Sequence, residues 1–168
     1  TSFVTLQNPT CLYVYDLNND GNKEIIVGAS DGILRAYDIS GAKRWEYNIG
    51  QIPYSIYVSD IDGDRLADIV IGTGRLDQGA FEYGSGTVTV LTHFGRLKWS
   101  YETTSAVKGL YVYDIDGDGN LDILASSNDG KLYALNNNGT EKWNRFTGSM
   151  SHPFVANVLG GTDKSIVH

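Results

Sequence analysis

The sequence contains a single cysteine, Cys11, in 168 residues. A lone cysteine excludes a disulfide within the chain, and it provides neither a zinc-binding cluster nor a redox pair. The three histidines, at positions 93, 152 and 168, stand in no motif that would pair them with a nucleophile. No apolar run approaches the roughly 20 residues that a membrane-spanning helix needs. We therefore predict no catalytic residue and no membrane insertion in this segment.

Positive charge is also scarce, because 13 Lys and Arg residues face 20 Asp and Glu residues and leave a formal net charge of −7. Nucleic-acid-binding proteins usually present a basic face, so we expect no nucleic-acid partner. The acidic residues are not evenly spread. Eleven of the 20 fall in three short segments, three in the first and four in each of the others. The acidity is therefore local.

These three segments share one nine-residue pattern: DLNNDGNKE from Asp16, DIDGDRLAD from Asp60 and DIDGDGNLD from Asp114. Positions 1, 3, 5 and 9 carry Asp, Asn or Glu oxygens, and the carbonyl of position 7 is a further candidate ligand. Ca²⁺ binds six to eight oxygens at roughly 2.3–2.6 Å, so we predict about three Ca²⁺ ions, one per loop. The predicted ligands are Asp16, Asn18, Asp20, Asn22 and Glu24, then Asp60, Asp62, Asp64, Leu66 and Asp68, and then Asp114, Asp116, Asp118, Asn120 and Asp122.

The spacing differs from that of the helical EF-hand loop, which has a glycine at position 6 and a bidentate glutamate at position 12. Here position 12 is Val27, Ile71 or Ala125, so the ninth residue must close the site. Each loop runs into a β-branched stretch, such as residues 25–27, that is typical of a strand. The loops therefore connect strand to strand. The alternative is a set of Asp/Gly turns that bind no metal.

Crowded carboxylates repel one another when no cation is present, which disfavours the compact state. Three Ca²⁺ would cancel most of the net charge of −7, and we expect ion binding to be coupled to folding. Loops without a glutamate at position 12 suit the higher Ca²⁺ concentration outside cells. We therefore predict an extracellular or cell-surface protein.

The repeat extends beyond the loops. Asp60 follows Asp16 by 44 residues, and Asp114 follows Asp60 by 54 residues. Around each loop stand four short strand patterns separated by turns, and repeats of this length are typical of propellers and solenoids. We predict an all-β fold of four-stranded antiparallel β-propeller blades, with three complete blades and a split or partial fourth. The predicted units span about residues 12–50, 56–104 and 110–148, with a partial unit at 154–168.

All three tryptophans occupy one position of the repeat, at Trp45, Trp99 and Trp143. Each is preceded by a basic residue, Arg44, Lys98 or Lys142, and opens the fourth strand. Large aromatic side chains dominate buried contacts, so we predict that the indoles pack between neighbouring blades. The alternative is a stacking platform for sugars.

The segment that ends in the DxDxDGxxD loop and continues into Ile-Val-x-Gly resembles the FG-GAP or VCBS repeat of integrin α-subunit propellers and many secreted microbial proteins. The second half of each unit, as in DGKLYALNNNGTEKW from Asp129 to Trp143, is similar to the PQQ-like propeller repeat. The resemblance implies that the loop carboxylates bind Ca²⁺. The first loop departs from the pattern at Asn18 and Glu24, and Arg65 replaces the usual glycine of the second loop.

Three blades cannot close a ring, because each blade packs against two neighbours. Residues 157–165 fall where a fourth loop would stand, but its ligand positions hold Asn157, Leu159, Gly161 and Ser165, so we expect no metal there. The chain also lacks an initial methionine. We expect it to be a piece of a larger propeller. The alternatives are a small ring whose closing blade joins both chain ends, and a ring completed by self-association of two chains.

The second unit is ten residues longer than the first, and its extra residues lie between its second and third strands, at residues 73–85. In an up-and-down blade these connections lie on the face opposite the acidic loops. A long loop on a rigid scaffold is a common place for recognition. We predict contacts to an unidentified protein or glycan partner, although a tolerated insertion is the alternative. The predicted contact residues are Arg75, Asp77, Gln78, Phe81, Glu82 and Tyr83.

Two classes of function fit the sequence. The first is a non-catalytic module for adhesion or for protein or glycan recognition, in which Ca²⁺ rigidifies the acidic loops. The second is a segment of a propeller enzyme, either a quinoprotein dehydrogenase or a calcium-dependent polysaccharide lyase. A quinoprotein needs a larger ring and a cofactor pocket, and a lyase needs a clustered base that the sequence does not show. We therefore favour the non-catalytic module.

Overall fold

The computed structural model describes residues 8–75 and 84–148, which form three four-stranded antiparallel sheets. In each sheet the strands lie side by side in chain order. The first sheet holds β1 Pro9–Tyr15, β2 Glu24–Ala29, β3 Ile33–Tyr37 and β4 Lys43–Asn48. The second holds β5 Ile52–Ser59, β6 Asp68–Gly74, β7 Gly86–Thr92 and β8 Leu97–Thr103. The third holds β9 Val107–Tyr113, β10 Asp122–Ser127, β11 Lys131–Asn136 and β12 Glu141–Phe146.

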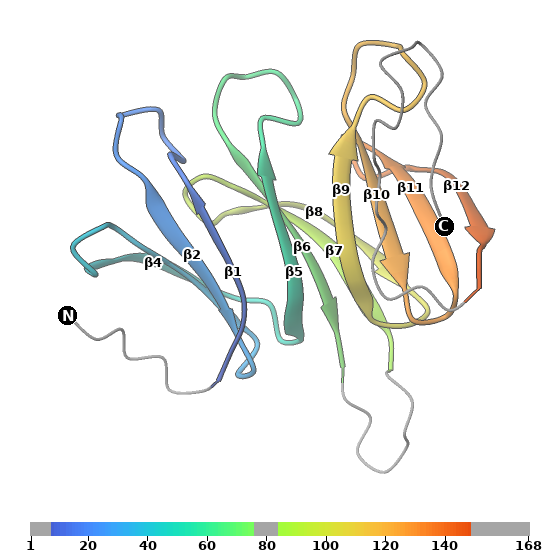
Figure 1. Cartoon of the computed structure of the whole chain (residues 1–168), viewed down its shortest axis with the longest axis horizontal. Helices are drawn as coiled ribbons and strands as arrows, with labels where there is room; N and C mark the ends of the chain where they lie inside the picture. The colour runs from blue at the N-terminus through green and yellow to red at the C-terminus, as the bar shows by residue number, and fades with distance from the viewer. Residues whose placement is uncertain (1–7, 76–83, 149–168) are drawn as a thin grey trace.

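The three sheets fan out side by side, with the first strand of each beside the first strand of the next (Figure 1). A row of tyrosines connects these strands. The ring centroids of Tyr13 and Tyr57 are 6.2 Å apart, and those of Tyr57 and Tyr111 are 6.1 Å apart. This arrangement is that of propeller blades. The predicted all-β propeller fold is confirmed.

The core lies between neighbouring sheets. Because successive side chains of a strand point to opposite faces of its sheet, one strand contributes residues to two interfaces. In β6, Ile69 and Ile71 pack against the first sheet, whereas Val70 between them packs toward the third sheet. All three side chains are fully buried. Burying one such side chain contributes about 1.5–3 kcal/mol. The second and third strands of each blade therefore supply most of the stability, while the fourth strands hold exposed and half-buried residues, with Thr103 as their one buried residue.

Trp45 and Trp99 pack between blades, as the sequence predicts, whereas Trp143 packs against buried residues of its own sheet. Trp45 Nε1 donates a hydrogen bond to the carbonyl of His93 at 3.0 Å, and Trp99 Nε1 donates to the carbonyl of Asn137 at 2.8 Å. In both pairs the indole of one blade reaches the turn between the third and fourth strands of the next. A glycine of that turn lies against the ring, and a Cβ at Gly95 would come within 2.6 Å of Trp45 Cε3.

The connections between first and second strands gather at one edge of the fan (Figure 1). These connections are the three acidic loops. The connections between β2 and β3 and between β10 and β11 lie at the opposite edge. The predicted partial unit at residues 154–168 lies outside the described residues.

Candidate functional site

Each acidic loop is a tight turn with two residues in the left-handed region of φ. These residues occupy positions 4 and 6 of the nine-residue pattern, and their φ values run from 58° to 89°. They are Asn19 and Gly21, Gly63 and Arg65, and Gly117 and Gly119. Such backbone suits glycine and is tolerated by asparagine. Arg65 adopts it at φ 71°, so the second loop keeps the geometry of the other two at a cost in strain.

The carboxylate at position 1 holds this turn closed by accepting backbone hydrogen bonds. In the second loop Asp60 accepts from the amide of Gly63 at 2.7 Å and from that of Arg65 at 2.8 Å. Asp114 does the same with Gly117 and Gly119, at 2.6 Å and 3.1 Å. The carboxylate at position 5 likewise accepts a hydrogen bond from the backbone amide of position 7, at 2.7–2.8 Å. The carboxylates at positions 1 and 5 are therefore turned toward the loop interior.

The closing residue at position 9 is buried in every loop. Glu24, Asp68 and Asp122 are 8%, 2% and 1% exposed. Each accepts a hydrogen bond from the backbone amide of position 2, at 2.9–3.4 Å. At position 2, Leu17 and Ile61 pack in the core between blades and Ile115 packs against the core of the third sheet, so this bond joins each loop to the core. The sheet thus positions the last carboxylate of each loop.

Two of the loops bring three carboxylates together. Oxygens of Asp60, Asp62 and Asp68 lie within 4.8 Å of one another, and so do those of Asp114, Asp116 and Asp118. Convergent carboxylate oxygens are the ligands that a hard cation such as Ca²⁺ prefers, so the donor chemistry of these loops fits that metal. The first loop has Asn18 at position 3, and it forms no such group among the described residues.

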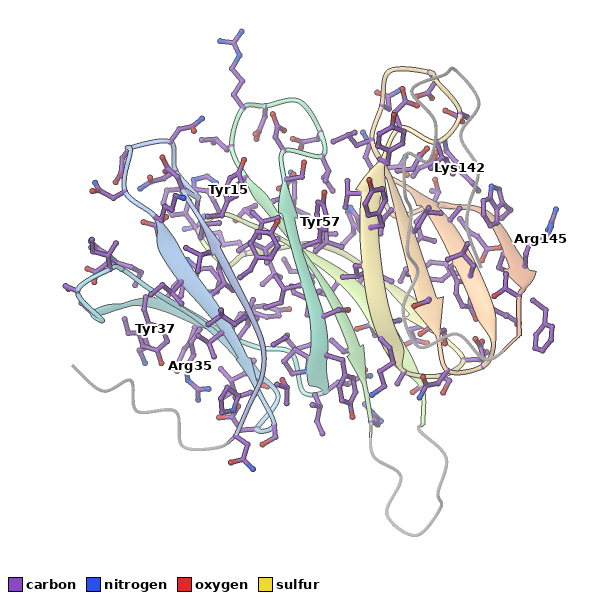
Figure 2. All side chains as sticks on the ribbon, viewed as in Figure 1. Tyr15, Arg35, Tyr37, Tyr57, Lys142 and Arg145 are labelled. Atoms are coloured by element: carbon purple, nitrogen blue, oxygen red, sulfur yellow. The ribbon has the colours of Figure 1, made fainter. Side chains whose placement is uncertain are left out.

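Two lysines that the sequence analysis left without a role enter these clusters. Lys98 Nζ lies 2.5 Å from Asp62 Oδ2 and 2.7 Å from Asp68 Oδ1. Lys142 Nζ lies 2.5 Å from Asp116 Oδ2 and 2.8 Å from Asp122 Oδ1. Each ammonium therefore bridges positions 3 and 9 of its own blade's loop, and Figure 2 shows Lys142 near the third loop. The one feature of the sequence that points to these lysines is the basic residue that precedes each tryptophan.

The ion pairs change the protonation equilibria of their members. The hydrogen bond from Lys98 lowers the pKa of Asp62, and burial raises the pKa of Asp68. Burial, the largest influence on Lys98, lowers its pKa, but the two carboxylates outweigh it and the net pKa is raised. Hydrogen bonds to Asp116 and Asp122 raise the pKa of Lys142. Both lysines are therefore positively charged at neutral pH.

The first blade is arranged differently. Arg44, at the repeat position of the two lysines, pairs with Asp38 at 3.1 Å, and its side chain is 60% exposed. It bridges no loop carboxylates; a cleft of about 290 Å³ lies beside the loop. The lining residues are Leu17, Asn18, Asp20, Glu24, Arg44, Trp45, His93 and Phe94. The predicted ligands at positions 3, 5 and 9 of the first loop thus face a cleft.

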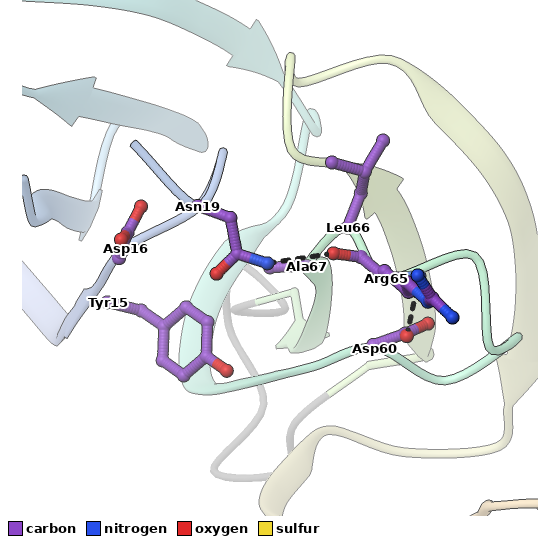
Figure 3. A pocket seen from close by; sticks show the side chains of 7 residues that line it. All are labelled: Tyr15, Asp16, Asn19, Asp60, Arg65, Leu66 and Ala67. Atoms are coloured by element: carbon purple, nitrogen blue, oxygen red, sulfur yellow. Dashed lines mark hydrogen bonds between the residues drawn. The ribbon is translucent and has the colours of Figure 1, made fainter. Parts of the chain in front are cut away.

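A second cleft, of about 340 Å³, lies between the first and second acidic loops. Figure 3 shows Asn19 reaching across from the first loop, where its side-chain amide donates to the carbonyl of Arg65 at 3.1 Å. Tyr15, Asp16, Asp60, Leu66 and Ala67 complete the lining. The first and second acidic loops are therefore in direct contact.

The predicted partner-binding loop is described only at its base. Arg75 is exposed, its amide donates to the carbonyl of Ser85 at 3.2 Å, and its carbonyl accepts from the amide of Gly84. The other predicted contact residues, Asp77, Gln78, Phe81, Glu82 and Tyr83, lie outside the described residues. The described part contains no helix long and apolar enough to cross a membrane.

Fold and loops together define a β-propeller protein with acidic turns between the first two strands of each blade. The chain belongs to the lambda-carrageenase beta-propeller domain family, whose model matches residues 8–81 and 80–166. It is 28% identical over 120 residues to lambda-carrageenases of Pseudoalteromonas carrageenovora and of another Pseudoalteromonas species. The match covers 71% of this chain but 12% of each relative.

Among solved structures, the WD40 repeats of RRP9 superimpose with a TM-score of 0.63 at 14% sequence identity. The superposition covers 89% of this chain and 42% of the RRP9 chain. At this identity the likeness shows the propeller fold alone. The family match supports a propeller related to carrageenases, whereas the finer resemblance to FG-GAP, VCBS and PQQ-like repeats stays a prediction.

Proposed function

We propose that this chain is a non-catalytic, calcium-binding propeller segment of an extracellular protein that recognises a polysaccharide. The observation that supports calcium binding is the convergence of three carboxylates in each of two loops, within 4.8 Å. In this proposal the loop carboxylates hold the ion, and the positive charge of the ion offsets the repulsion between those carboxylates. No reaction step is assigned to it.

Family membership supports the choice of a polysaccharide over a protein partner. The curated relatives are named lambda-carrageenases, and their propeller domain is the part that this chain matches. We therefore propose carrageenan as the glycan. The described residues present no histidine paired with a nucleophile, which favours binding over catalysis. The second candidate function is a segment of the catalytic apparatus of a carrageenan-degrading enzyme, which the same relatives favour.

The test measures calcium and glycan separately. Calorimetric titration of the 168-residue chain with Ca²⁺ should show about three sites, and the melting temperature should rise from chelator to Ca²⁺ by several degrees. An Asp116→Ala variant should bind about one Ca²⁺ fewer, with Asn138→Ala, on a nearby turn outside the acidic loops, as its control. Absence of Ca²⁺ binding would contradict the metal assignment.

Glycan recognition is tested by affinity electrophoresis in gels that contain lambda-carrageenan, with a gel that contains agarose as the control. Retardation in the first gel alone supports the proposal. Release of new reducing ends from carrageenan by the chain would instead support the enzyme candidate. Neither retardation nor product would reject both glycan functions.

A further inference from the structure

The basic residue before the tryptophan of each blade lies next to the acidic loop of the same blade. In the second and third blades it is a lysine whose ammonium bridges positions 3 and 9 at 2.5–2.8 Å. These side chains are only 23% and 15% exposed. Their fourth strands, β8 and β12, start at the same edge as the loops, which explains how residues distant in sequence meet.

The three copies differ in a correlated way. Where position 3 is Asp62 or Asp116, the strand supplies a lysine that binds it. Where position 3 is Asn18, the strand supplies Arg44, which binds Asp38 instead. Asn18 then serves its own loop, because its amide donates to Asp20 Oδ2 at 3.0 Å. Position 3 therefore has two uses, as the partner of a lysine or as part of the turn.

The number of carboxylates explains why two loops have a bridging lysine and the first does not. The second and third loops each hold four carboxylates, one more than the first, and one ammonium offsets the extra charge. The bridged carboxylate at position 9 is nearly inaccessible, with 3% and 1% of its side chain exposed. Removing one partner of so buried a pair leaves an uncompensated charge. A divalent ion bound by the same two carboxylates would stand within a few ångströms of the ammonium and be repelled by it.

We propose that Lys98 and Lys142 are built-in cations that hold the second and third loops closed without metal and compete with Ca²⁺ for positions 3 and 9. No ammonium bridges positions 3 and 9 of the first loop, and a cleft that Arg44 helps to line lies there instead. The inference rests on the proposed calcium binding. It assigns the three loops to two classes, a first loop whose positions 3 and 9 no ammonium bridges and two loops in which a lysine competes with Ca²⁺.

The first experiment compares Lys98→Met and Lys142→Met with the matched control Lys43→Met, at an exposed lysine paired with Glu46 outside the acidic loops, by calorimetric Ca²⁺ titration. Methionine keeps the length of the stem and removes the charge. Each lysine variant should bind one Ca²⁺ at least about tenfold more tightly than the parent chain, because a repulsion is removed. Lys43→Met should leave the affinities unchanged. Unchanged or weaker binding by both lysine variants would overturn the inference.

Thermal melting in chelator gives an independent measure. Lys98→Met should lower the melting temperature by roughly 5–10 °C, because Asp68 loses its partner. Ca²⁺ should restore most of that loss. If the variant does not fold in chelator, the titration is carried out by refolding it in Ca²⁺. A variant that melts like the parent chain in chelator would overturn the closing role of the lysine.

A transplant tests the same idea by gain of function. The double variant Asn18→Asp, Arg44→Lys gives the first blade the residues of the other two. It should raise the melting temperature in chelator and weaken Ca²⁺ binding at the first loop about tenfold. Arg44→Lys alone should do neither. If the parent chain binds no Ca²⁺ at all, the proposed function fails; if Ca²⁺ binds but lysines do not alter it, only this inference fails.

Discussion

At the scale of single residues, an ion pair between Asp31 and Arg35 stabilises one turn of the first blade. Asp31, in the turn between β2 and β3, lies 2.7 Å from Arg35 Nη2, and its other oxygen accepts from Arg35 Nη1 and from the amide of Ile33. The two side chains are 16% and 7% exposed. The hydrogen bond from Arg35 lowers the pKa of Asp31.

An Asp31→Asn variant should lose about 1–3 kcal/mol of unfolding free energy at pH 7, because a nearly buried guanidinium loses its main partner. The folded pKa lies below the unfolded value of about 3.9, so this stability is present above that pH and is lost as pH falls through the folded pKa. Urea unfolding should therefore show the difference from the parent chain shrinking as the pH falls below the unfolded pKa of about 3.9.

The matched control is Lys43→Gln, which removes the exposed Lys43–Glu46 pair at 2.7 Å. Exposed pairs contribute about 0–1 kcal/mol, so a small effect is expected. An Asp31→Asn effect no larger than this, or one independent of pH, would contradict the assignment.

At the scale of elements, contact between a fourth strand and the next blade links neighbouring blades. The third-to-fourth-strand turn of the third blade carries Gly139 at φ +85°, and a Cβ there would come within 2.7 Å of Trp99 Cδ2. Because the indole also donates to Asn137 in the same turn, the ring has little freedom to move away. Indole and turn form one packed joint between blades.

Gly139→Ala should therefore destabilise the chain by about 2–4 kcal/mol, from backbone strain and overpacking together. Gly50→Ala is the matched control, because Gly50 also has a positive φ, +75°, but nothing lies within 4 Å of its added Cβ. It should cost only the backbone term, about 1–2 kcal/mol. Equal losses for the two variants in denaturant unfolding would show that the tryptophan contact does not limit the site.

At the scale of the whole molecule, three blades form an arc. The first sheet presents Leu12 and Val14, 62% and 47% exposed, and the third presents Phe146, 77% exposed. Apolar residues exposed on sheet faces favour association. We therefore expect the 18.4 kDa chain to self-associate in solution.

Sedimentation velocity should show a mass above 18.4 kDa that increases with concentration. A Leu12→Lys, Val14→Lys variant should shift the population toward the monomer, because a charged group in an apolar contact is costly. The control is Ile39→Lys, an exposed apolar residue on a turn. Monomers at every concentration would contradict association of the chain.

Much of this architecture follows from the sequence alone. The strands, the turns and the propeller fold follow because each blade repeats one hydrophobic alternation around one acidic loop, and local hydrogen bonding is encoded within a few residues. The role of the tryptophans follows for a similar reason, since a large aromatic residue at one fixed position has few places to be buried.

Only the tertiary structure decided how the acidic loops are occupied. Lys98 lies 36 residues from Asp62 and Lys142 lies 26 residues from Asp116, so the bridge forms only where the fourth strand returns beside the loop. The same fold turns Arg44 toward Asp38, which no local pattern indicates. The sequence by itself determined where three acidic loops stand, whereas packing of distant strands determined that two of them already contain a positive charge.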